Sequence, residues 1–237
     1  TYVFHQAAIP SVPRSIAAPE ATHEVNATGT LYVLIAARDA GVKKVVYASS
    51  CAVYGDTPTM PLREDMPPRP LSPYAVSKLA GEGYCSVFTT CYGLPTVALR
   101  YFNVYGPRQD PDSEYAAVIP KFIRAAIQGD PLTIYGDGQQ TRDFAFAGDL
   151  AAANVMAASS ALTGVFNIGS SQEVSVNHLA DLIRNATAST SPVEHVAARS
   201  GEIVHSISGI RRAALLGWKP TLSLERGLET TVALMLR

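Results

Sequence analysis

The sequence is short of charge. Asp, Glu, Lys and Arg make up 16% of its 237 residues, and they nearly cancel to a formal net charge of -1. Without a block of lysine and arginine, a nucleic-acid-binding surface has no electrostatic basis. Apolar residues reach 47%, but the apolar run at 232–236 is far too short to span a bilayer. We therefore expect a globular protein whose partners are neither nucleic acid nor a membrane.

Cysteine is also scarce. The three cysteines, Cys51, Cys85 and Cys91, are odd in number and lack the paired spacing of a metal site. This pattern predicts neither a disulfide framework nor a bound metal, and it indicates a reducing, cytoplasmic location. The opening residues 1–8 (TYVFHQAA) are not typical of a signal peptide; they predict a buried strand in the middle of a fold.

Strand-like and helix-like segments alternate in the first part of the chain. Short apolar runs at 2–8, 43–49 and 96–101 predict strands, and the segments 19–40 and 71–92 have helical patterns. Runs of β-branched residues such as KKVVYAS are typical of parallel strands that are covered on both faces. The alternation predicts an α/β fold with a doubly wound, parallel, Rossmann-like sheet.

The ends of the two predicted helices carry capping signals. Ser72 and Pro73 suit the N-cap and the first position of one helix, and Gly93 suits its C-terminal cap. Gly41 suits the C-terminal cap of the other.

After Gly106 the regular pattern loosens. Pro, Gly and Asp become frequent, and the predicted helices and strands are shorter. We interpret 1–106 as the remainder of a dinucleotide-binding domain, to which 142–163 returns, and 107–237 mainly as a smaller C-terminal substrate-binding lobe.

Polar side chains follow two of the predicted strands. Tyr74 and Lys78 are four residues apart on one helix face, and a nearby ammonium should lower the pKa of the phenol. Ser50 and Asn103 each follow a strand at the edge where ligands bind in open α/β sheets. Alone, the Tyr–Lys pair is equally typical of an ordinary surface helix, and the serines are typical of a polar turn.

Motifs in a fixed order run along the whole chain. In chain order they are FHQAA, VNATGT, SSCAVYG, YAVSK, RYFNVYGPRQDP, AAVIPKFI, IYGDGQQTRDF, FNIGSS and LGWKP. With these motifs the chain resembles the extended short-chain dehydrogenases/reductases that modify nucleotide sugars, most closely the UDP-glucose 4-epimerase group.

The resemblance implies NAD as cofactor and assigns the catalytic residues. Tyr74 would be the acid/base, Lys78 would also hold the nicotinamide ribose, and Ser50 would bind the same sugar oxygen as Tyr74. The remaining residues implied to lie at the cofactor are Asn26, Ala7, Ala8 and Ser49.

The resemblance also implies a nucleotide-sugar site. Asn103 would contact the substrate, and Arg142 and Arg199 would bind its diphosphate, because guanidinium groups match phosphate oxygens. Arg142 could instead pair with Asp143 or Asp149. The segment implied to line the nucleotide includes Ala117, Val118 and Lys121.

The reaction follows from the turn that contains Ser50. Dehydratases and decarboxylases of the family carry an acidic residue where this chain has Cys51 and Ala52. The remaining outcome is oxidation at sugar C4, rotation of the keto intermediate and return of the hydride to the opposite face, which is 4-epimerisation. GDP-fucose synthases carry Ser-Ser-Cys here with the cysteine as an acid, so Cys51 could act likewise; a buried structural cysteine is the alternative.

The glycine-rich cofactor fingerprint of the family is missing from these residues. The spaced glycines at 136–141 precede no helix, and roughly 60 residues, two βαβ units, are expected ahead of Thr1. We expect either an incomplete record of a longer protein or a truncated product that binds NAD weakly. A catalytically impaired chain that binds nucleotide sugar or a partner is therefore the second functional hypothesis. The segment 205–213, with Gly209 in place of an aspartate, departs from the family only locally.

A homodimer is expected under either hypothesis. In the family, helices equivalent to 19–40 and 71–92 form a two-fold, four-helix interface.

Overall fold

The main sheet has four parallel strands. The computed structural model describes residues 1–111, 117–198 and 204–236, and within them the strand order is β1–β2–β3–β8. The predicted parallel α/β fold is confirmed, and the predicted strands at 2–8, 43–49 and 96–101 correspond to the first three. These strands are β1 (Tyr2–His5), β2 (Lys44–Ser50), β3 (Thr96–Tyr101) and β8 (Gly164–Ile168).

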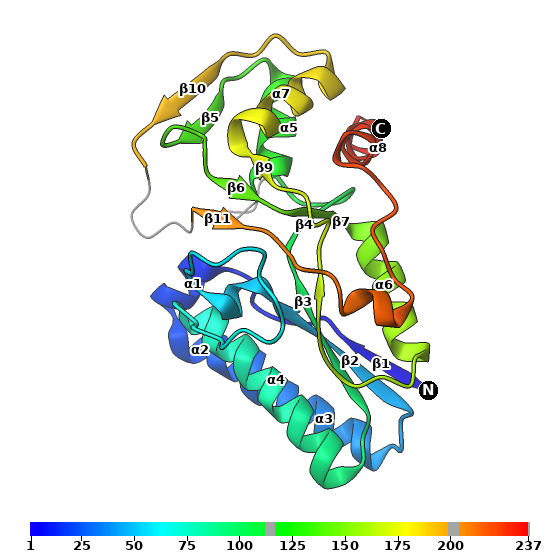
Figure 1. Cartoon of the computed structure of the whole chain (residues 1–237). Helices are drawn as coiled ribbons and strands as arrows, with labels where there is room; N and C mark the ends of the chain where they lie inside the picture. The colour runs from blue at the N-terminus through cyan, green and yellow to red at the C-terminus, as the bar shows by residue number, and fades with distance from the viewer. Residues whose placement is uncertain (112–116, 199–203, 237) are drawn as a thin grey trace.

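Helices cover both faces of this sheet (Figure 1). On one face lie α3 (Gly29–Asp39) and α4 (Pro73–Tyr92), and on the other lies α6 (Ala147–Ser159). Alternate residues of β2 point to opposite faces, so Val45 and Tyr47 join the core under α3 and α4, whereas Val46 joins the core under α6. Two separate cores on one buried strand are what a doubly wound sheet requires.

The long helix α4 has the ends that its sequence predicts. Ser72 Oγ accepts a hydrogen bond from Ala75 N at 3.2 Å, Pro73 occupies the first turn, and Gly93 follows in the left-handed conformation with φ 67°. The helix begins two residues later than the predicted Leu71. Its fixed start matters for function because Tyr74 lies in the first turn.

The helix predicted over 19–40 is present, but it contains a π turn that the sequence did not predict, so three helical segments follow one another without a break. They are α2 (Pro19–His23), a π-helical turn η1 (Glu24–Thr28) and α3, and a further short helix α1 (Val12–Ala17) precedes them. The reason lies in Asn26 of the π turn, whose side chain is bound to the backbone of Ile9 rather than to solvent. π turns inside helices are frequent at functional sites.

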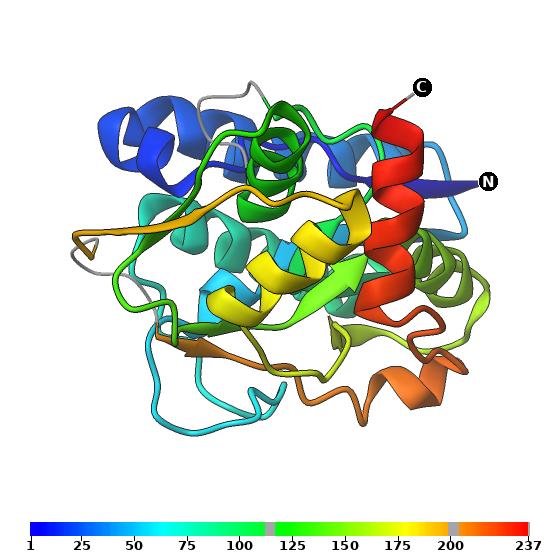
Figure 2. The ribbon, with the colours of Figure 1, turned by 90° about the horizontal axis from the view of Figure 1, so that it is seen from above.

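The C-terminal lobe has its own core above the sheet, built on three amphipathic helices (Figure 2). The helices are α5 (Val118–Gln128), α7 (Val176–Thr187) and α8 (Leu224–Met235). The short strands that accompany them are β5 (Leu132–Tyr135) with β10 (Val193–Val196), and β6 (Thr141–Arg142) between β9 (Val174–Ser175) and β11 (His205–Ser206). The strand pair β4 (Asn103–Tyr105) and β7 (Phe144–Phe146) connects the lobe to the sheet. The short 3-10 turns are η2 (Cys51–Tyr54) and η3 (Ala213–Leu216).

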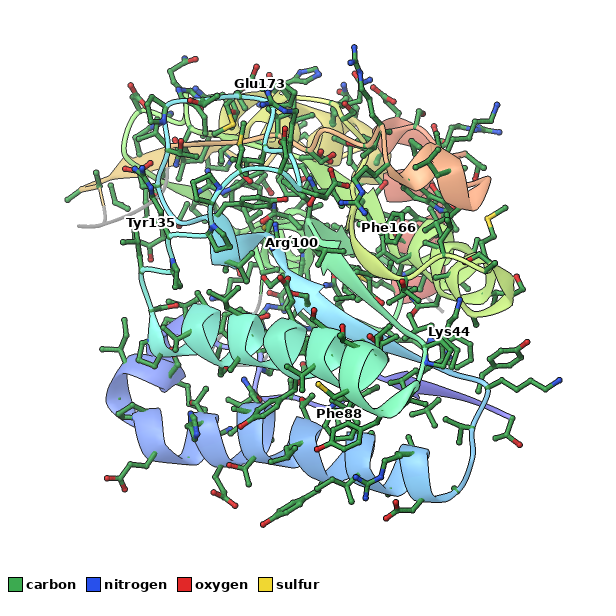
Figure 3. The ribbon with its side chains drawn as sticks, turned by 60° about the horizontal axis from the view of Figure 1, so that its bottom comes forward. Lys44, Phe88, Arg100, Tyr135, Phe166 and Glu173 are labelled. Atoms are coloured by element: carbon green, nitrogen blue, oxygen red, sulfur yellow. The ribbon has the colours of Figure 1, made fainter. Side chains whose placement is uncertain are left out.

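A buried lysine joins β2 to the end of α6 (Figure 3). Lys44 Nζ donates to the carbonyl oxygens of Ala157 (3.2 Å), Ser160 (2.5 Å) and Leu162 (3.0 Å). Ala157 lies in the last turn of α6, where its carbonyl oxygen also accepts from Ser160 Oγ at 3.0 Å, and Ser160 and Leu162 follow the helix. The C-terminal end of a helix dipole favours a cation. Lys44 therefore caps the helix that closes one face of the sheet.

Candidate active site

A cleft of about 840 Å³ lies where the carboxyl ends of β2 and β3 meet the C-terminal lobe. The cleft brings together residues from distant parts of the chain, as the open edge of a parallel sheet should. The sequence-predicted residues that line it are Ala8, Ser49, Ser50, Tyr74, Lys78, Asn103, Ala117 and Arg142.

Tyr74 and Ser50 lie next to each other in the wall of this cleft. Tyr74 is in the first turn of α4, and Ser50 ends β2, where its hydroxyl also accepts a hydrogen bond from Ala52 N at 3.2 Å. The two side chains share a hydrogen bond. Both hydroxyls are therefore placed to contact one oxygen atom of a ligand.

Lys78 is one helical turn beyond Tyr74, and its buried ammonium lies 5.9 Å from the centre of the Tyr74 ring. Its Nζ donates to Ala48 O at 2.9 Å. Burial lowers the pKa of Lys78 to about 8. Among the described residues, Ala48 O is the one atom that accepts a hydrogen bond from Lys78 Nζ. Two of the three ammonium N–H groups therefore remain for a ligand.

The expected lowering of the Tyr74 pKa by Lys78 is wrong for this arrangement. Burial raises the pKa of Tyr74, and the hydrogen bond with Ser50 acts in the opposite direction. Lys78 directs its ammonium to the Ala48 carbonyl, and it is itself poorly solvated, so desolvation dominates at both groups.

Asn26 acts on the cleft through the backbone. Its Oδ1 accepts from Ile9 N at 2.7 Å, and its Nδ2 donates to Ile9 O at 3.1 Å and to Ser77 Oγ at 3.0 Å. Asn26 thus holds the segment after β1, which contains Ala7 and Ala8, against α4. Ala8 lines the cleft, and Ala7 is exposed beside it.

Ser49 belongs to a buried polar network that sequence reasoning missed, with Arg100 at its centre (Arg100 is labelled in Figure 3). Ser49 Oγ donates to Glu82 Oε1 at 2.5 Å, and Arg100 binds both Glu82 oxygens at 2.8 and 2.7 Å. The Arg100 guanidinium also lies 4.6 Å from the Tyr54 ring, and the Tyr54 hydroxyl donates to Asn167 at 2.7 Å. The network ties α4, β2, β3 and β8 together next to Ser50 and Lys78 of the cleft.

A second pocket of about 530 Å³ adjoins the cleft on the side of the lobe. It shares Asn103, Ala117 and Arg142 with the cleft, and Val118 and Lys121 of α5 line its wall. Arg142 Nη1 donates to the carbonyl oxygens of Thr141 and Val204, which orients the guanidinium beside the pocket. Asn103 Nδ2 donates to Asp143 O at 3.1 Å. Arg199 lies outside the described residues.

Cys51 is half-buried at the inner wall of the cleft. Burial raises the pKa of its thiol to about 11, with a further contribution from Asp143 that Arg142 and a hydrogen bond with Ser206 oppose. The thiol is therefore protonated at neutral pH. A protonated thiol in the cleft wall is compatible both with a structural cysteine and with the acid of the GDP-fucose synthase alternative.

Other cleft-lining residues were not predicted from the sequence. Gln6, His205 and Ser206 line the cleft, and the fully buried Asp143 follows the cleft residue Arg142 in the chain. Gln6 and Asp143 lie within motifs that were used for other residues, FHQAA and TRDF, so position in those motifs was the available signal.

Of the residues that the structure describes, no group of His, Cys, Asp and Glu is arranged to hold a metal ion. None of the described helices combines the length and the apolar character that crossing a membrane requires.

Comparisons with known proteins agree with this geometry. A family model described as "NAD dependent epimerase/dehydratase family" matches residues 1–169. The UDP-glucose 4-epimerase of Mycolicibacterium smegmatis is 41% identical over 233 residues, which cover 97% of this chain and 74% of that protein.

Solved structures match over nearly the whole chain. The structure of UDP-glucose 4-epimerase from Thermotoga maritima with UDP-glucose superposes with a TM-score of 0.96 at 36% identity, covering 99% of this chain and 77% of the other. A UDP-N-acetylglucosamine 4-epimerase from Methanobrevibacter ruminantium, in complex with UDP-N-acetylmuramic acid, gives a TM-score of 0.97 at 43% identity, covering 99% and 76%.

Proposed function

Because the chain belongs to the NAD dependent epimerase/dehydratase family, we propose that it is an NAD-dependent nucleotide-sugar 4-epimerase that acts on a UDP-hexose. The observation that carries the proposal is the placement of Tyr74, Ser50 and Lys78 on one wall of the cleft. The named relatives include 4-epimerases of UDP-glucose and of UDP-N-acetylglucosamine. The reaction is shared by these relatives, whereas the sugar differs among them.

The residues of the chain fit the nicotinamide ribose of NAD. Lys78 has two N–H groups beyond its bond to Ala48, and these suit ribose hydroxyls. Its lowered pKa reflects an ammonium that burial deprives of water, and a polyhydroxylated ligand would restore hydrogen bonds to it. The segment containing Ala7 and Ala8, fixed by Asn26, would form the adjacent wall.

In the reaction, Tyr74 and Ser50 act on the sugar. NAD, held by Lys78 and the segment that contains Ala7 and Ala8, would supply the acceptor and then the donor of the C4 hydride, and the keto sugar would turn over between the two transfers. The deprotonated form of Tyr74 would accept the proton of the C4 hydroxyl in the oxidation and give it back to the keto oxygen in the reduction. Ser50, already hydrogen-bonded to Tyr74, holds the same oxygen in place.

The second pocket would receive the nucleotide diphosphate. Arg142 would bind the diphosphate, Asn103 would contact the sugar nucleotide, and the wall containing Ala117, Val118 and Lys121 would face the base. We assign Arg199 to the same diphosphate on the basis of the family resemblance. In this assignment 1–106 with 142–163 serves mainly the cofactor, and 107–237 serves mainly the substrate.

The proposal extends to the assembly and its location. Val76, Tyr84 and Val87 form an exposed apolar stripe on α4, and Val25 and Tyr32 form another on η1 and α3. Two such neighbouring stripes suit a two-fold homodimer. All three cysteines are free, which suits the reducing cytoplasm.

Conversion of UDP-galactose to UDP-glucose, with NAD supplied, tests the proposed reaction. We expect Tyr74→Phe to lower kcat about 10²–10⁴-fold, the range for a lost acid/base, while the Kd of UDP changes less than about twofold. Tyr92→Phe, at the exposed end of the same helix, is the matched control and should retain activity. Tight UDP binding without any turnover by the unmodified protein would instead favour a nucleotide-sugar-binding chain that is catalytically impaired.

A further inference from the structure

Three chain segments that pass between the main sheet and the C-terminal lobe meet at one point. The first is 141–146, which leads from β6 to β7, and the second is 168–174, which leads from β8 to β9. The third is 205–209, which begins with β11 and returns towards the sheet. Figure 1 shows these passages side by side below the lobe. The relative position of the two parts of the molecule depends on how these segments are fixed to one another.

Asp143 fixes them. Its carboxylate is fully buried and accepts five hydrogen bonds. From the second segment, Ser170 N and Ser170 Oγ donate at 2.6 Å and Ser171 N donates at 3.0 Å. From the third, Ser208 donates through its backbone N at 2.9 Å and through its hydroxyl. Every donor is a backbone amide or a neutral hydroxyl, so the contacts depend on geometry rather than on an ion pair.

The surroundings of this carboxylate leave no space for rearrangement. A Cβ atom added to Gly169 would lie 2.8 Å from Asp143 Oδ2 and would also collide with the Ser208 hydroxyl. Ser171 adds direct bonds between the second and third segments, through its N to Ser208 Oγ at 3.2 Å and through its hydroxyl to Ser208 O at 2.9 Å. The three segments therefore form one packed junction around Asp143.

This junction carries residues of the proposed substrate site. Arg142 immediately precedes Asp143, and successive residues of an extended chain point to opposite sides. Anchoring Asp143 inward thus directs Arg142 outward, where it lines both the cleft and the second pocket. The backbone oxygen of Asp143 accepts the hydrogen bond of Asn103, and Ser206, paired in register with Arg142, lines the cleft as well.

We propose that Asp143 is a positioning residue that sets the separation of the sheet and the lobe and so holds Arg142 and Asn103 in place for the nucleotide diphosphate. The substrate class in this statement rests on the proposed function. Asp143 itself would not contact the ligand, because its carboxylate is fully buried and accepts hydrogen bonds from the second and third segments.

Asp143→Asn tests the proposal. The amide that replaces one oxygen is a donor, and it would face amide and hydroxyl donors, so part of the junction must open. Asp149→Asn is the matched control. Asp149 is also a buried carboxylate, and it accepts from Thr221 and from Leu222 N. These contacts tie α6 to the segment before α8, away from the cleft.

The measurement is the Kd of UDP by calorimetry, with thermal unfolding of each variant. We expect Asp143→Asn to weaken UDP binding at least tenfold, and Asp149→Asn to change it less than twofold although both variants lose stability. Unchanged UDP binding in Asp143→Asn, or an equal loss in both variants, would overturn the proposal. If Asp143→Asn does not fold, Ser208→Ala removes one hydroxyl donor to Asp143 and should weaken UDP binding about threefold. An unchanged Kd of UDP in Ser208→Ala would also overturn the proposal.

Hydrogen exchange separates this proposal from the proposed function. Failure of the unmodified protein to bind UDP would reject the substrate assignment and leave the junction to be judged by exchange alone. The backbone amides of Ser170, Ser171 and Ser208 should exchange faster in Asp143→Asn, with peptides covering 221–222 unchanged. The reverse pattern is expected in Asp149→Asn. Unchanged exchange at the three serines in Asp143→Asn would show that Asp143 does not hold the junction.

Discussion

Two buried lysines in this protein, Lys44 and Lys78, differ in the number of hydrogen bonds that their ammonium groups donate. Lys44 donates to three carbonyl oxygens at the end of α6, whereas Lys78 donates to Ala48 O. Burial lowers the pKa of both, and for Lys78 the value falls to about 8. An ammonium that has N–H groups left over in a cleft suits a ligand with hydrogen-bond acceptors, and its desolvation lowers the stability of the fold.

We therefore expect Lys78→Met to abolish turnover and yet to stabilise the fold. A pKa of about 8 instead of 10.5 corresponds to roughly 3 kcal/mol against the charged form. The lost hydrogen bond to Ala48 offsets about 1 kcal/mol, which leaves a net gain of roughly 2 kcal/mol at pH 7. Denaturant unfolding measures this gain, with the exposed Lys43→Met as a neutral control.

The difference in stability between the unmodified protein and Lys78→Met should depend on pH. The folded-state pKa of Lys78 is depressed, so between about pH 8 and 10.5 the unfolded chain binds more protons at this residue than the folded chain. Stability from this residue consequently rises with pH across that window, and the deficit of the unmodified protein relative to Lys78→Met should shrink there. A difference that is constant from pH 7 to 10.5 would contradict the assignment.

The residues proposed as catalytic were more predictable from the sequence than the residues that support them. Tyr74, Lys78 and Ser50 could be placed together because they occupy ordered motifs at strand and helix ends, and the structure brings them to one cleft. Glu82 and Asp143 could not, because a single carboxylate in a helix or a short strand has the same pattern whether it faces water or five buried donors. Hydrogen bonds across the fold, not local pattern, decide that difference.

At the scale of single elements, α6 depends on a residue from another part of the chain. Lys44→Met would remove this donor from the carbonyl oxygens of Ser160 and Leu162, and it would remove a cation from the helix end; Ala157 O would keep its hydrogen bond from Ser160 Oγ. We expect a loss of about 1–3 kcal/mol in the free energy of unfolding, the range for buried polar groups left unpaired. Lys43→Met, at the exposed neighbouring position, should change it by less than about 0.5 kcal/mol; equal effects would argue against the cap.

Element prediction succeeded where local signals were strong. Helix α4 could be predicted because Ser72, Pro73 and Gly93 mark its ends, and β2 and β3 because each is a continuous buried run. The π turn at 24–28 could not, because the bond between Asn26 and Ile9 forms only when β1 is in place. The two-residue strands of the lobe are likewise fixed by pairing partners far along the chain.

At the scale of the whole molecule, the stripe on α4 predicts the oligomeric state. Val87 is 48% exposed and lies one turn after Tyr84 on the face that carries Val76. Val87→Glu would place a charge in the proposed two-fold interface, and we expect it to convert a dimer to a monomer in analytical ultracentrifugation. Leu215→Glu, at an exposed apolar residue of η3, should leave the mass unchanged. A monomeric unmodified protein would reject the interface.

The strand order also sets a sequence of events during folding. Strands β1, β2 and β3 follow one another closely with α3 and α4 between them, whereas β8 begins at Gly164, long after β3 ends at Tyr101. Closing so long a loop is slow compared with forming the earlier pairs. The first three strands should therefore assemble while β3 still has an open edge, and β8 should dock last. Until it does, that edge can pair with another chain, so efficient refolding depends on how quickly the segment between β3 and β8 becomes compact.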